Sequence, residues 1–570
     1  MKKNDLLTGF VDSYGSEGEG VLHAEGVSVF VPYAIKGEKI TCKILKVKGN
    51  IAFGKVEEIL VKSEERTEPR CPVFSKCGGC NLQHIEYGKQ LEIKREIVKN
   101  CFKKIAHVDA EAESVFPSEP YGYRNKLQLP VRCDNGKAVL GFFRSNSHDV
   151  VPTNECAIQA DGAKKIIGFF KKFLSENDLS AYDESTKKGI LKHVVVRCYE
   201  GEFLFTLVTK SGKINCVNRL IEGLISEFGE KISVVRNFND ADTNVILGEK
   251  CEVLYGSGFI GVCEENVRYE IGPYSFMQVN NAVKRKIYED VVSLGNVNKN
   301  TVVIDGYSGA GVMTSMLAKR AKNAYGIEIV EEASLAAEKL KRDNGISNMF
   351  PVCAPCEVAL PEILAEEKAK GGETLLVLDP PRKGADSSVI AAILSSLPER
   401  IIYVSCSPST LARDTGLLIG SLKQENGKIV NGNIESGAYK IENVRLYDMF
   451  AQTSNVETLV VLSKKIPDSH INIDVEFGEG EGQFSLKKIK ERAEARKPKE
   501  KVTYKMIQEY IEKTYGLKVH TAYIAEVKRD LGLPMYDASN AVEELKRPRA
   551  HPTPKMAKAI KETLKHFEII

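Results

Sequence analysis

Cys406 is the residue whose type and position best suit covalent chemistry. Ile401 to Val404 form a short apolar run that predicts a buried strand, and the segment 405–408 (SCSP) predicts a turn into a helix. Cys406 is therefore expected at the carboxyl end of a strand, the edge at which open α/β sheets bind ligands. A thiol there lies near a helix dipole and backbone N–H groups, which favour the thiolate nucleophile. The alternative is a buried structural cysteine.

Two acidic residues follow other expected strands. The run 375–378 (LLVL) leads into Asp379 and two prolines that fix an extended turn, so this carboxylate is expected at the same sheet edge. The segment 301–311 (TVVIDGYSGAG) predicts a strand and a glycine-rich turn, where backbone approaches a nucleotide-like ligand. The next strand, 323–329, contains Glu328 about 20 residues further on, where an acid meets ribose hydroxyls. These segments predict a doubly wound domain that binds an adenosine-containing cofactor.

The chain resembles a known enzyme family in the order and spacing of five segments: DGYSGAGVMT, YGIEIV, LDPPRKG, YVSCSPSTLARD and YDMFAQTSNVETLVVL. They are similar to those of the S-adenosylmethionine-dependent RNA uracil-5-methyltransferases, and specifically the ribosomal RNA type, over residues 1–465. The resemblance implies that Cys406 is the nucleophile and Glu457 the general base. It implies cofactor contacts from Gln278, Tyr307, Glu328 and Asp379. One departure is Asn455, where many relatives carry His.

Three closely spaced cysteines, Cys71, Cys77 and Cys80, predict a metal site. Disulfides are rare in cytosolic proteins, and zinc and iron–sulfur clusters both accept three thiolates and normally require a fourth ligand. Cys156, which follows a Pro-Thr-Asn turn, is the expected fourth ligand. The spacing alone leaves zinc and iron–sulfur open, whereas the family resemblance implies a 4Fe–4S cluster.

Two regions have the composition of RNA-binding surfaces. Residues 1–60 alternate apolar and polar positions in short runs, which predicts a small β-barrel of the oligonucleotide-binding kind. The resemblance implies a TRAM domain there, and the alternative is a barrel that only supports its neighbour. The segment 123–126 (YRNK) joins a ring to cations and an amide, which suits a splayed RNA base and its phosphates. The alternative is a strand end with solvated charges.

Length and composition indicate how these residues are held. At 570 residues, with 43% hydrophobic and 28% charged residues, the chain is expected to form several globular domains. We expect an oligonucleotide-binding-type β-barrel (TRAM), a central α+β domain with the iron–sulfur cluster, an α/β Rossmann-like methyltransferase domain and a C-terminal helical module. The expected bounds are 1–60 for the β-barrel, 61–275 for the central domain and 276–465 for the methyltransferase domain. A linker is expected at 466–501, followed by the helical module at 502–570.

The reaction implied is methylation of carbon 5 of a uridine in 23S ribosomal RNA. A thiolate adds to carbon 6 and makes carbon 5 nucleophilic toward the methyl donor, and a base then removes the carbon 5 proton. The alternatives are a tRNA uracil-5-methyltransferase and a non-catalytic iron–sulfur RNA-binding protein of the same fold. The chain lacks a run of about 18 apolar residues and an apolar N-terminal signal core, so we expect a cytoplasmic monomer whose partner is RNA, with no membrane partner.

Overall fold

The structure is a computed structural model that describes residues 1–465 except 113, 135, 161 and 178, and residues 504–531 and 551–567. The chain divides into two compact units, residues 1–493 and 494–570. The expected linker, residues 466–501, lies outside the described residues. Among the residues that are described, every helix is too short or too polar to cross a membrane.

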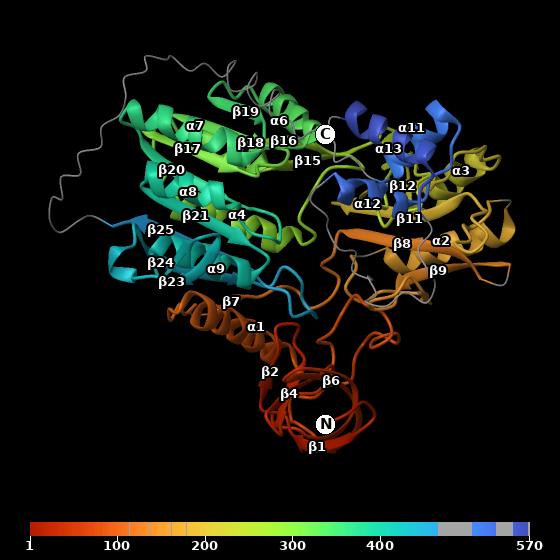
Figure 1. Ribbon diagram of the computed structural model, residues 1–570, viewed down its shortest axis with the longest axis horizontal. Coiled ribbons are helices and arrows are strands. Elements are labelled where there is room, and N and C mark those ends of the chain that lie inside the picture. Colours follow the sequence, from red (N-terminus) through yellow and green to blue (C-terminus); the bar gives the residue numbers. More distant parts are fainter. Residues whose placement is uncertain are drawn as a thin grey trace. The chain divides into compact units, whose positions relative to one another are not determined.

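The N-terminal strands form a six-stranded sheet in the order β1-β5-β6-β4-β3-β2. Their bounds are Leu6–Phe10, Ser13–Tyr14, Gly20–Ala24, Val27–Val31, Lys39–Lys48 and Ile51–Val61 for β1 to β6. In β5, Ile40, Cys42 and Ile44 are buried while the residues between them are not, so the sheet curls around a small apolar core (Figure 1, red). The predicted small β-structure is confirmed, and its assignment as a TRAM domain stays a prediction.

A second sheet has seven strands in the order β10-β9-β8-β11-β12-β13-β14. The strands are β8 Lys126–Asp134, β9 Lys137–Phe143, β10 Val150–Pro152, β11 Leu191–Tyr199, β12 Glu202–Thr209, β13 Ile232–Phe238 and β14 Lys250–Tyr255. Strands β11 and β12 pair antiparallel. Helix α2 (Ala163–Glu176) packs Ile166 and Phe170, one turn apart, into the core of this sheet.

An eight-stranded sheet in the order β19-β18-β17-β20-β21-β25-β24-β7 carries the candidate chemistry (Figure 1). The strands are β7 Val115–Phe116, β17 Thr301–Gly306, β18 Asn323–Glu328, β19 Met349–Cys353, β20 Glu373–Leu378, β21 Arg400–Ser405, β24 Tyr439–Tyr447 and β25 Glu457–Lys464. Strands β17 to β21 are parallel, and β25 runs antiparallel to β21. This is the doubly wound sheet that the sequence predicts.

Helices cover both faces of this sheet, which explains why its strands are continuous apolar runs. One core cluster joins alternate strand residues to α4 (Asn281–Leu294), α5 (Val312–Ala318) and α6 (Glu331–Asp343). The cluster formed by the other alternate residues includes α7 (Cys356–Ala369), α8 (Ser387–Ser396) and α9 (Pro408–Ile419).

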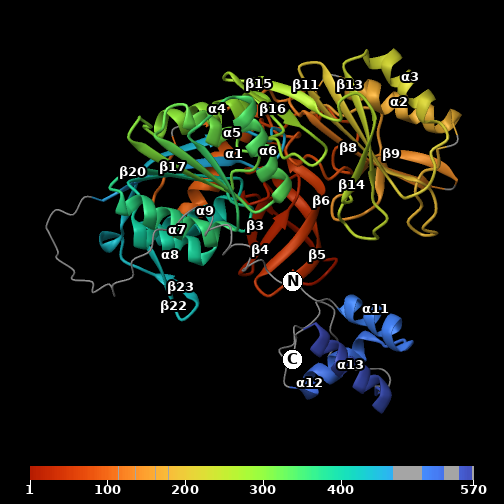
Figure 2. The ribbon, with the colours of Figure 1, turned by 90° about the horizontal axis from the view of Figure 1, so that it is seen from above.

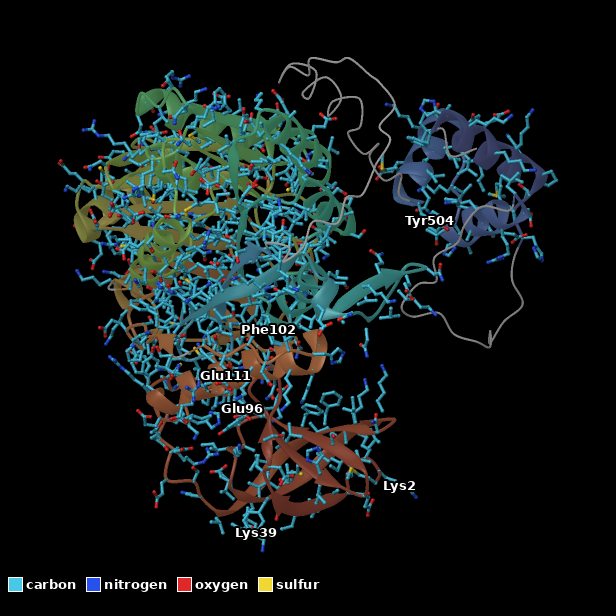
Figure 3. All side chains as sticks on the ribbon, turned by 90° about the vertical axis from the view of Figure 1, so that its left-hand side faces the viewer. Lys2, Lys39, Glu96, Phe102, Glu111 and Tyr504 are labelled. Atoms are coloured by element: carbon cyan, nitrogen blue, oxygen red, sulfur yellow. The ribbon has the colours of Figure 1, made fainter. Side chains whose placement is uncertain are left out.

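Helix α1 (Tyr87–Cys101) also packs on the eight-stranded sheet. Phe102, labelled in Figure 3, follows α1 and is fully buried in the α7–α9 cluster. Strand β7 pairs with β24 in the same sheet. Helix α1, Phe102 and strand β7 therefore contact this sheet, although they precede the seven-stranded sheet in the chain. The expected domain bounds of 61–275 and 276–465 stay predictions.

In the second unit, the described residues 504–531 and 551–567 form the helices α11 (Tyr504–Tyr515), α12 (Thr521–Asp530) and α13 (Pro554–His566) (Figure 2, blue). They share an apolar core formed by Ile507, Ile511, Ile524, Val527, Ile560 and Leu564. Gly516 follows α11 with a φ of +65°, a conformation in which glycine meets no Cβ penalty. The helices expected within residues 502–570 are confirmed.

Candidate active site

The parallel strands bring four of the singled-out residues to one edge of the sheet. Glu328 ends β18, while Tyr307, Asp379 and Cys406 directly follow β17, β20 and β21. Gly306 pairs with Leu378, and Leu378 pairs with Tyr403, so these strands reach the edge close together. The carboxyl edge of an open α/β sheet is where such folds bind ligands, as the sequence predicts.

Glu457 joins this edge because its strand runs the opposite way. Strand β25 begins at Glu457, and Ser405 at the end of β21 pairs with Thr458. The carboxyl end of β21 therefore lies beside the amino end of β25, which places Cys406 next to Glu457. The Glu457 side chain is only 3% exposed.

The surroundings of Glu457 keep its proton bound more tightly than usual. Burial raises the pKa of Glu457 to about 8, with a further contribution from the nearby carboxylate of Asp379. The Arg382 guanidinium opposes this shift. A carboxyl group with a raised pKa is suited to accept a proton at neutral to slightly alkaline pH.

Arg382 connects the two candidate catalytic groups, and sequence reasoning missed it. Burial and the Glu457 carboxylate raise the pKa of the Cys406 thiol, whereas Arg382 hydrogen-bonds to this thiol and lowers its pKa. Burial and the neighbouring acid therefore oppose the thiolate form that the strand-to-helix junction was expected to favour. The only sequence signal for Arg382 was its place in the Asp-Pro-Pro-Arg turn.

The glycine-rich turn after β17 is braced by Glu328. Its two carboxylate oxygens accept hydrogen bonds from the backbone N–H of Gly309 (2.9 Å) and of Val330 (2.8 Å). Gly309 has a φ of +55° and Tyr307 a φ of +67°, so the turn uses left-handed backbone before α5 begins. Glu328 thus holds the turn in place and lies beside it, where an acid can reach a ribose.

A buried acid that was not singled out, Asp305, lies under the same turn. It accepts a hydrogen bond from the Thr314 hydroxyl at 2.5 Å, and burial with nearby Asp379 and Glu328 raises its pKa to about 7. Asp379 is exposed at the open edge of the sheet. The protein atoms around its carboxyl group nevertheless displace water, and this loss of hydration raises its pKa to about 7. Asp305, Glu328 and Asp379 thus place three carboxyl groups close together at this edge, and their mutual repulsion contributes to the raised pKa of Asp305.

Gln278 lies in the segment that connects β16 (Val267–Ile271) to α4. Its backbone carbonyl accepts a hydrogen bond from the Asn125 side-chain amide at 3.0 Å, and the Asn125 N–H donates to the Val279 carbonyl at 2.9 Å. Asn280 caps α4 by accepting from the Val283 N–H. The seven-stranded sheet therefore fixes this segment, and the contact of the Gln278 side chain with a cofactor stays a prediction.

Residues 86–465 match the protein family described as tRNA (uracil-5-)-methyltransferase. The chain belongs to this family. An uncharacterized RNA methyltransferase of Clostridium tetani is 36% identical over 466 residues, which cover 81% of this chain and 97% of that protein. Another from Oceanobacillus iheyensis is 36% identical over 474 residues, which cover 82% of this chain and 98% of that protein. The chain is an S-adenosylmethionine-dependent RNA (uracil-5-)-methyltransferase.

A solved structure agrees with the family match. This chain is similar to the crystal structure of Pyrococcus abyssi tRNA (uracil-54, C5)-methyltransferase in complex with S-adenosyl-L-homocysteine. The TM-score is 0.62 and the sequence identity is 26%. The match covers 80% of this chain and 99% of that chain. The family match ends at residue 465, so α11, α12 and α13 lie beyond it.

The four singled-out cysteines of the methyltransferase line one cavity of about 760 Å³, which also borders β8 and β9. Burial raises the pKa of Cys80 to about 12 and that of Cys156 to about 11, and the neighbouring thiols contribute to both shifts. Donors point at the sulfurs: the Gly79 N–H lies 3.3 Å from Cys77 Sγ, and backbone N–H groups meet the Cys156 thiol. Half-buried thiols that line one cavity and meet N–H donors are compatible with an iron–sulfur cluster.

The spacing of these cysteines left zinc open as the alternative to a cluster. A tetrahedral zinc site draws its sulfurs to within about 4 Å of one another. Across the described part of the chain, no three His, Cys, Asp or Glu side chains converge closely enough to hold a metal ion.

In the segment 123–126 (YRNK), the two cations line a cavity, whereas the ring that was expected to stack on an RNA base is buried. Tyr123 is 9% exposed and donates a hydrogen bond to the Ala451 carbonyl at 2.9 Å, so its ring is part of the core and cannot stack on an RNA base. Asn125 is also buried. Arg124 and Lys126 do line the cavity beside the cysteines, and burial with the nearby cations Arg197 and Arg124 lowers the pKa of Lys126 to about 8. An anion would relieve this repulsion.

Proposed function

We propose that the methyltransferase modifies carbon 5 of a specific uridine in 23S ribosomal RNA, with Cys406 as nucleophile and Glu457 as general base. The observation that carries this proposal is the pairing of β21 with β25, which sets a thiol beside a buried carboxyl group of raised pKa. Both groups lie at the sheet edge that also bears the glycine-rich turn. Nucleophile, base and donor site are thus within one open edge.

The protein side of the reaction follows from this arrangement. The Cys406 thiolate forms a bond to carbon 6 of the uracil, and the ring electrons move to carbon 5 and its neighbouring carbonyl. S-adenosylmethionine, when bound, would supply the methyl group that carbon 5 takes up, and would leave as S-adenosylhomocysteine once its bond to that methyl group breaks. Glu457 then accepts the carbon 5 proton, the bond from sulfur to carbon 6 breaks, and the thiolate is restored. The Arg382 guanidinium stabilises the thiolate form of Cys406 before it adds to carbon 6 and after the methylated uracil leaves it.

Four residues are proposed to hold the cofactor: Gln278, Tyr307, Glu328 and Asp379. Three of them share the carboxyl edge of the eight-stranded sheet, and Glu328 braces the glycine-rich turn. The fourth, Gln278, precedes α4 in a segment fixed by Asn125. Glu328 and Asp379 are acceptors for ribose and amine groups, and both suit a cofactor whose reactive end is cationic.

Cys71, Cys77, Cys80 and Cys156 are proposed to ligate a 4Fe–4S cluster. Their common cavity and the N–H groups directed at sulfur support this. Arg124 and Lys126, on the same cavity, are proposed to contact phosphates of the RNA next to the extruded uridine. The N-terminal barrel is proposed to extend this RNA contact as a TRAM domain.

The RNA class is the part of the proposal that most needs an experiment. The sequence motifs resemble the ribosomal RNA type, whereas the similar solved structure is named as a tRNA enzyme, so tRNA is the second candidate. Labelled methyl transfer should be measured on 23S rRNA and on tRNA purified from cells that lack the gene. Incorporation into 23S rRNA supports the proposal, and incorporation into tRNA alone replaces it with the second candidate.

A further inference from the structure

The segment 448–456 leads from β24 to the general base, and it is held by residues far away in the chain. Its residue Gln452 has a φ of +68°, a left-handed conformation that a residue with a side chain adopts only when surrounding contacts impose it. Helix α1 supplies some of these contacts, because Lys94 forms a buried ion pair with Asp448 and Gln90 donates to the Gln452 side chain at 3.0 Å.

Asn81 makes the contacts nearest to the base. The backbone N–H groups of Asn81 and Leu82 both donate to the Gln452 carbonyl, at 3.1 Å and 3.0 Å. The Asn81 side chain forms a reciprocal pair with Ser454: its oxygen accepts from the Ser454 N–H at 3.0 Å, and its amide donates to the Ser454 hydroxyl at 3.2 Å. Ser454 lies three residues before Glu457 in the chain.

Asn81 is also the residue that directly follows Cys80. Its amide donates a further hydrogen bond to the carbonyl of Glu17, in the turn between β2 and β3, at 2.6 Å. The cysteine segment, defined as residues 71–82, thus contacts Gln452 and Ser454 of the loop that ends at Glu457. Tyr123, beside Cys80 in a small apolar cluster, donates to the Ala451 carbonyl of the same loop.

We infer that Asn81 is a positioning residue for Glu457, through which the cysteine segment fixes the loop that carries the base. This inference rests on the proposed role of Glu457. A merely structural role would predict that loss of the Asn81 side chain lowers stability and slows every step equally. A positioning role predicts that proton removal slows while addition of Cys406 to the RNA does not, because Cys406 is held by β21 and α9 and not by this loop.

The test uses the full chain with Asn81→Ala, and Asn239→Ala as a matched control. Asn239 is more deeply buried than Asn81, and its amide likewise donates two hydrogen bonds, to the carbonyls of Val245 and Ile246 in the loop between β13 and β14. In Asn81→Ala, methylated RNA attached to Cys406 should accumulate and turnover should fall by up to about 10²-fold, the scale of a small misplacement of a catalytic group. Hydrogen exchange in residues 448–456 should quicken, while iron content stays unchanged.

Ser454→Ala sharpens the test because it removes the hydroxyl and keeps the backbone N–H. It should show a smaller effect than Asn81→Ala, and the double variant should be no worse than Asn81→Ala alone, since both changes break one pair. The inference is overturned if Asn81→Ala matches Asn239→Ala in adduct level and exchange, or if addition and proton removal slow together. Glu457→Gln is measured in parallel to distinguish a failure of this inference from a failure of the proposed function. If Glu457 is not the base, Glu457→Gln itself accumulates no adduct; if only the inference about Asn81 fails, Glu457→Gln still does.

A second inference rests on helix α13. It buries Ala559, Ile560, Thr563 and Leu564 in the core of the second unit. At about 100° per residue, the exposed residues Lys558, Lys561 and Lys565 lie together on the opposite side of the helix. The one acidic residue of α13, Glu562, hydrogen-bonds with Tyr515. We propose that this lysine face, defined as Lys558, Lys561 and Lys565, binds the phosphate backbone of the substrate RNA outside the target uridine.

Charge complementarity selects RNA as the occupant. Exposed lysines contact phosphates by releasing counterions, so their contribution to binding depends on salt and not on base sequence. The helix lies beyond the family match, which ends at residue 465, so this contact would be an addition to the shared enzyme.

The test compares two full-length triple variants on a 23S rRNA transcript. One carries Lys558→Glu, Lys561→Glu and Lys565→Glu, and the control carries Lys513→Glu, Lys518→Glu and Arg529→Glu, exposed cations of the same unit. The slope of log Kd against log salt should decrease by about 2 in the first, at roughly 0.7–0.9 per phosphate contact, and by less than about 1 in the control. Equal slopes in the two variants, or a first variant that binds like the unmodified protein, would overturn the proposal.

Discussion

Ser405 pairs with Thr458 across the antiparallel strands β21 and β25, and this register brings the candidate nucleophile and base together. Cys406 is the next residue after one strand, and Glu457 is the first residue of the other. A shift of one residue in this pairing would turn the Glu457 side chain to the other face of the sheet. The burial of β25 on both faces explains why the register is firmly fixed.

Removing the nucleophile should abolish covalent capture of RNA. RNA with 5-fluorouridine at the target should trap the unmodified protein as a methylated adduct, because the base cannot remove fluorine. Cys406→Ala should form no adduct, which a denaturing gel with label from the methyl donor would show. Cys198→Ala, a half-buried cysteine outside the site, serves as the control. An adduct that persists in Cys406→Ala would refute the role of Cys406.

Removing the base should allow addition but block release. Glu457→Gln keeps the size of the side chain but cannot accept the carbon 5 proton, so methylated RNA should remain attached to Cys406, and turnover should fall by roughly 10²–10⁴-fold. Adduct formation should also extend to lower pH, since the Glu457 carboxylate raises the pKa of Cys406. Normal turnover in Glu457→Gln would exclude it as the base, and Asp379 would be tested next.

The rate of turnover should increase with pH. Glu457 must be ionised to accept the carbon 5 proton, and its pKa of about 8 puts the acid limb of kcat near that pH. The thiol of Cys406 titrates in the same profile, so the limb reports both groups. Arg382→Gln removes the cation that lowers both pKa values, so the limb should move to higher pH. Lys383→Gln, an exposed cation next in the chain, should leave it in place. A limb that moves to lower pH in Arg382→Gln would contradict this account.

The cysteine site should contain iron. Purified without oxygen, the protein should be brown and contain about four irons per chain. Cys156→Ala should lower the iron content, whereas Cys133→Ala, which does not line the cavity of the four cysteines, should keep it. Metal analysis and the visible spectrum are the measurements. One equivalent of zinc without colour would show that the site is not an iron–sulfur site.

Much of the fold follows from local sequence patterns. The apolar runs before Asp379 and Cys406 predicted β20 and β21, and the glycine-rich turn predicted the start of α5. Both predictions succeed because the burial of a strand and the conformational freedom of a turn depend on residues adjacent in the sequence. The same holds for α11, α12 and α13, whose apolar residues recur at helical spacing.

The sequence by itself determined the types of reactive group, their order and the strand ends that carry them. Only the tertiary structure decided that Arg382 touches Cys406, that Tyr123 is buried, and that Asn81 holds the loop before Glu457. Asn81 and Ser454 are 373 positions apart, and no local pattern reports a contact between residues so distant in the chain. The shifts in pKa have the same origin, because burial and neighbouring charges arise only when separate strands meet at one edge.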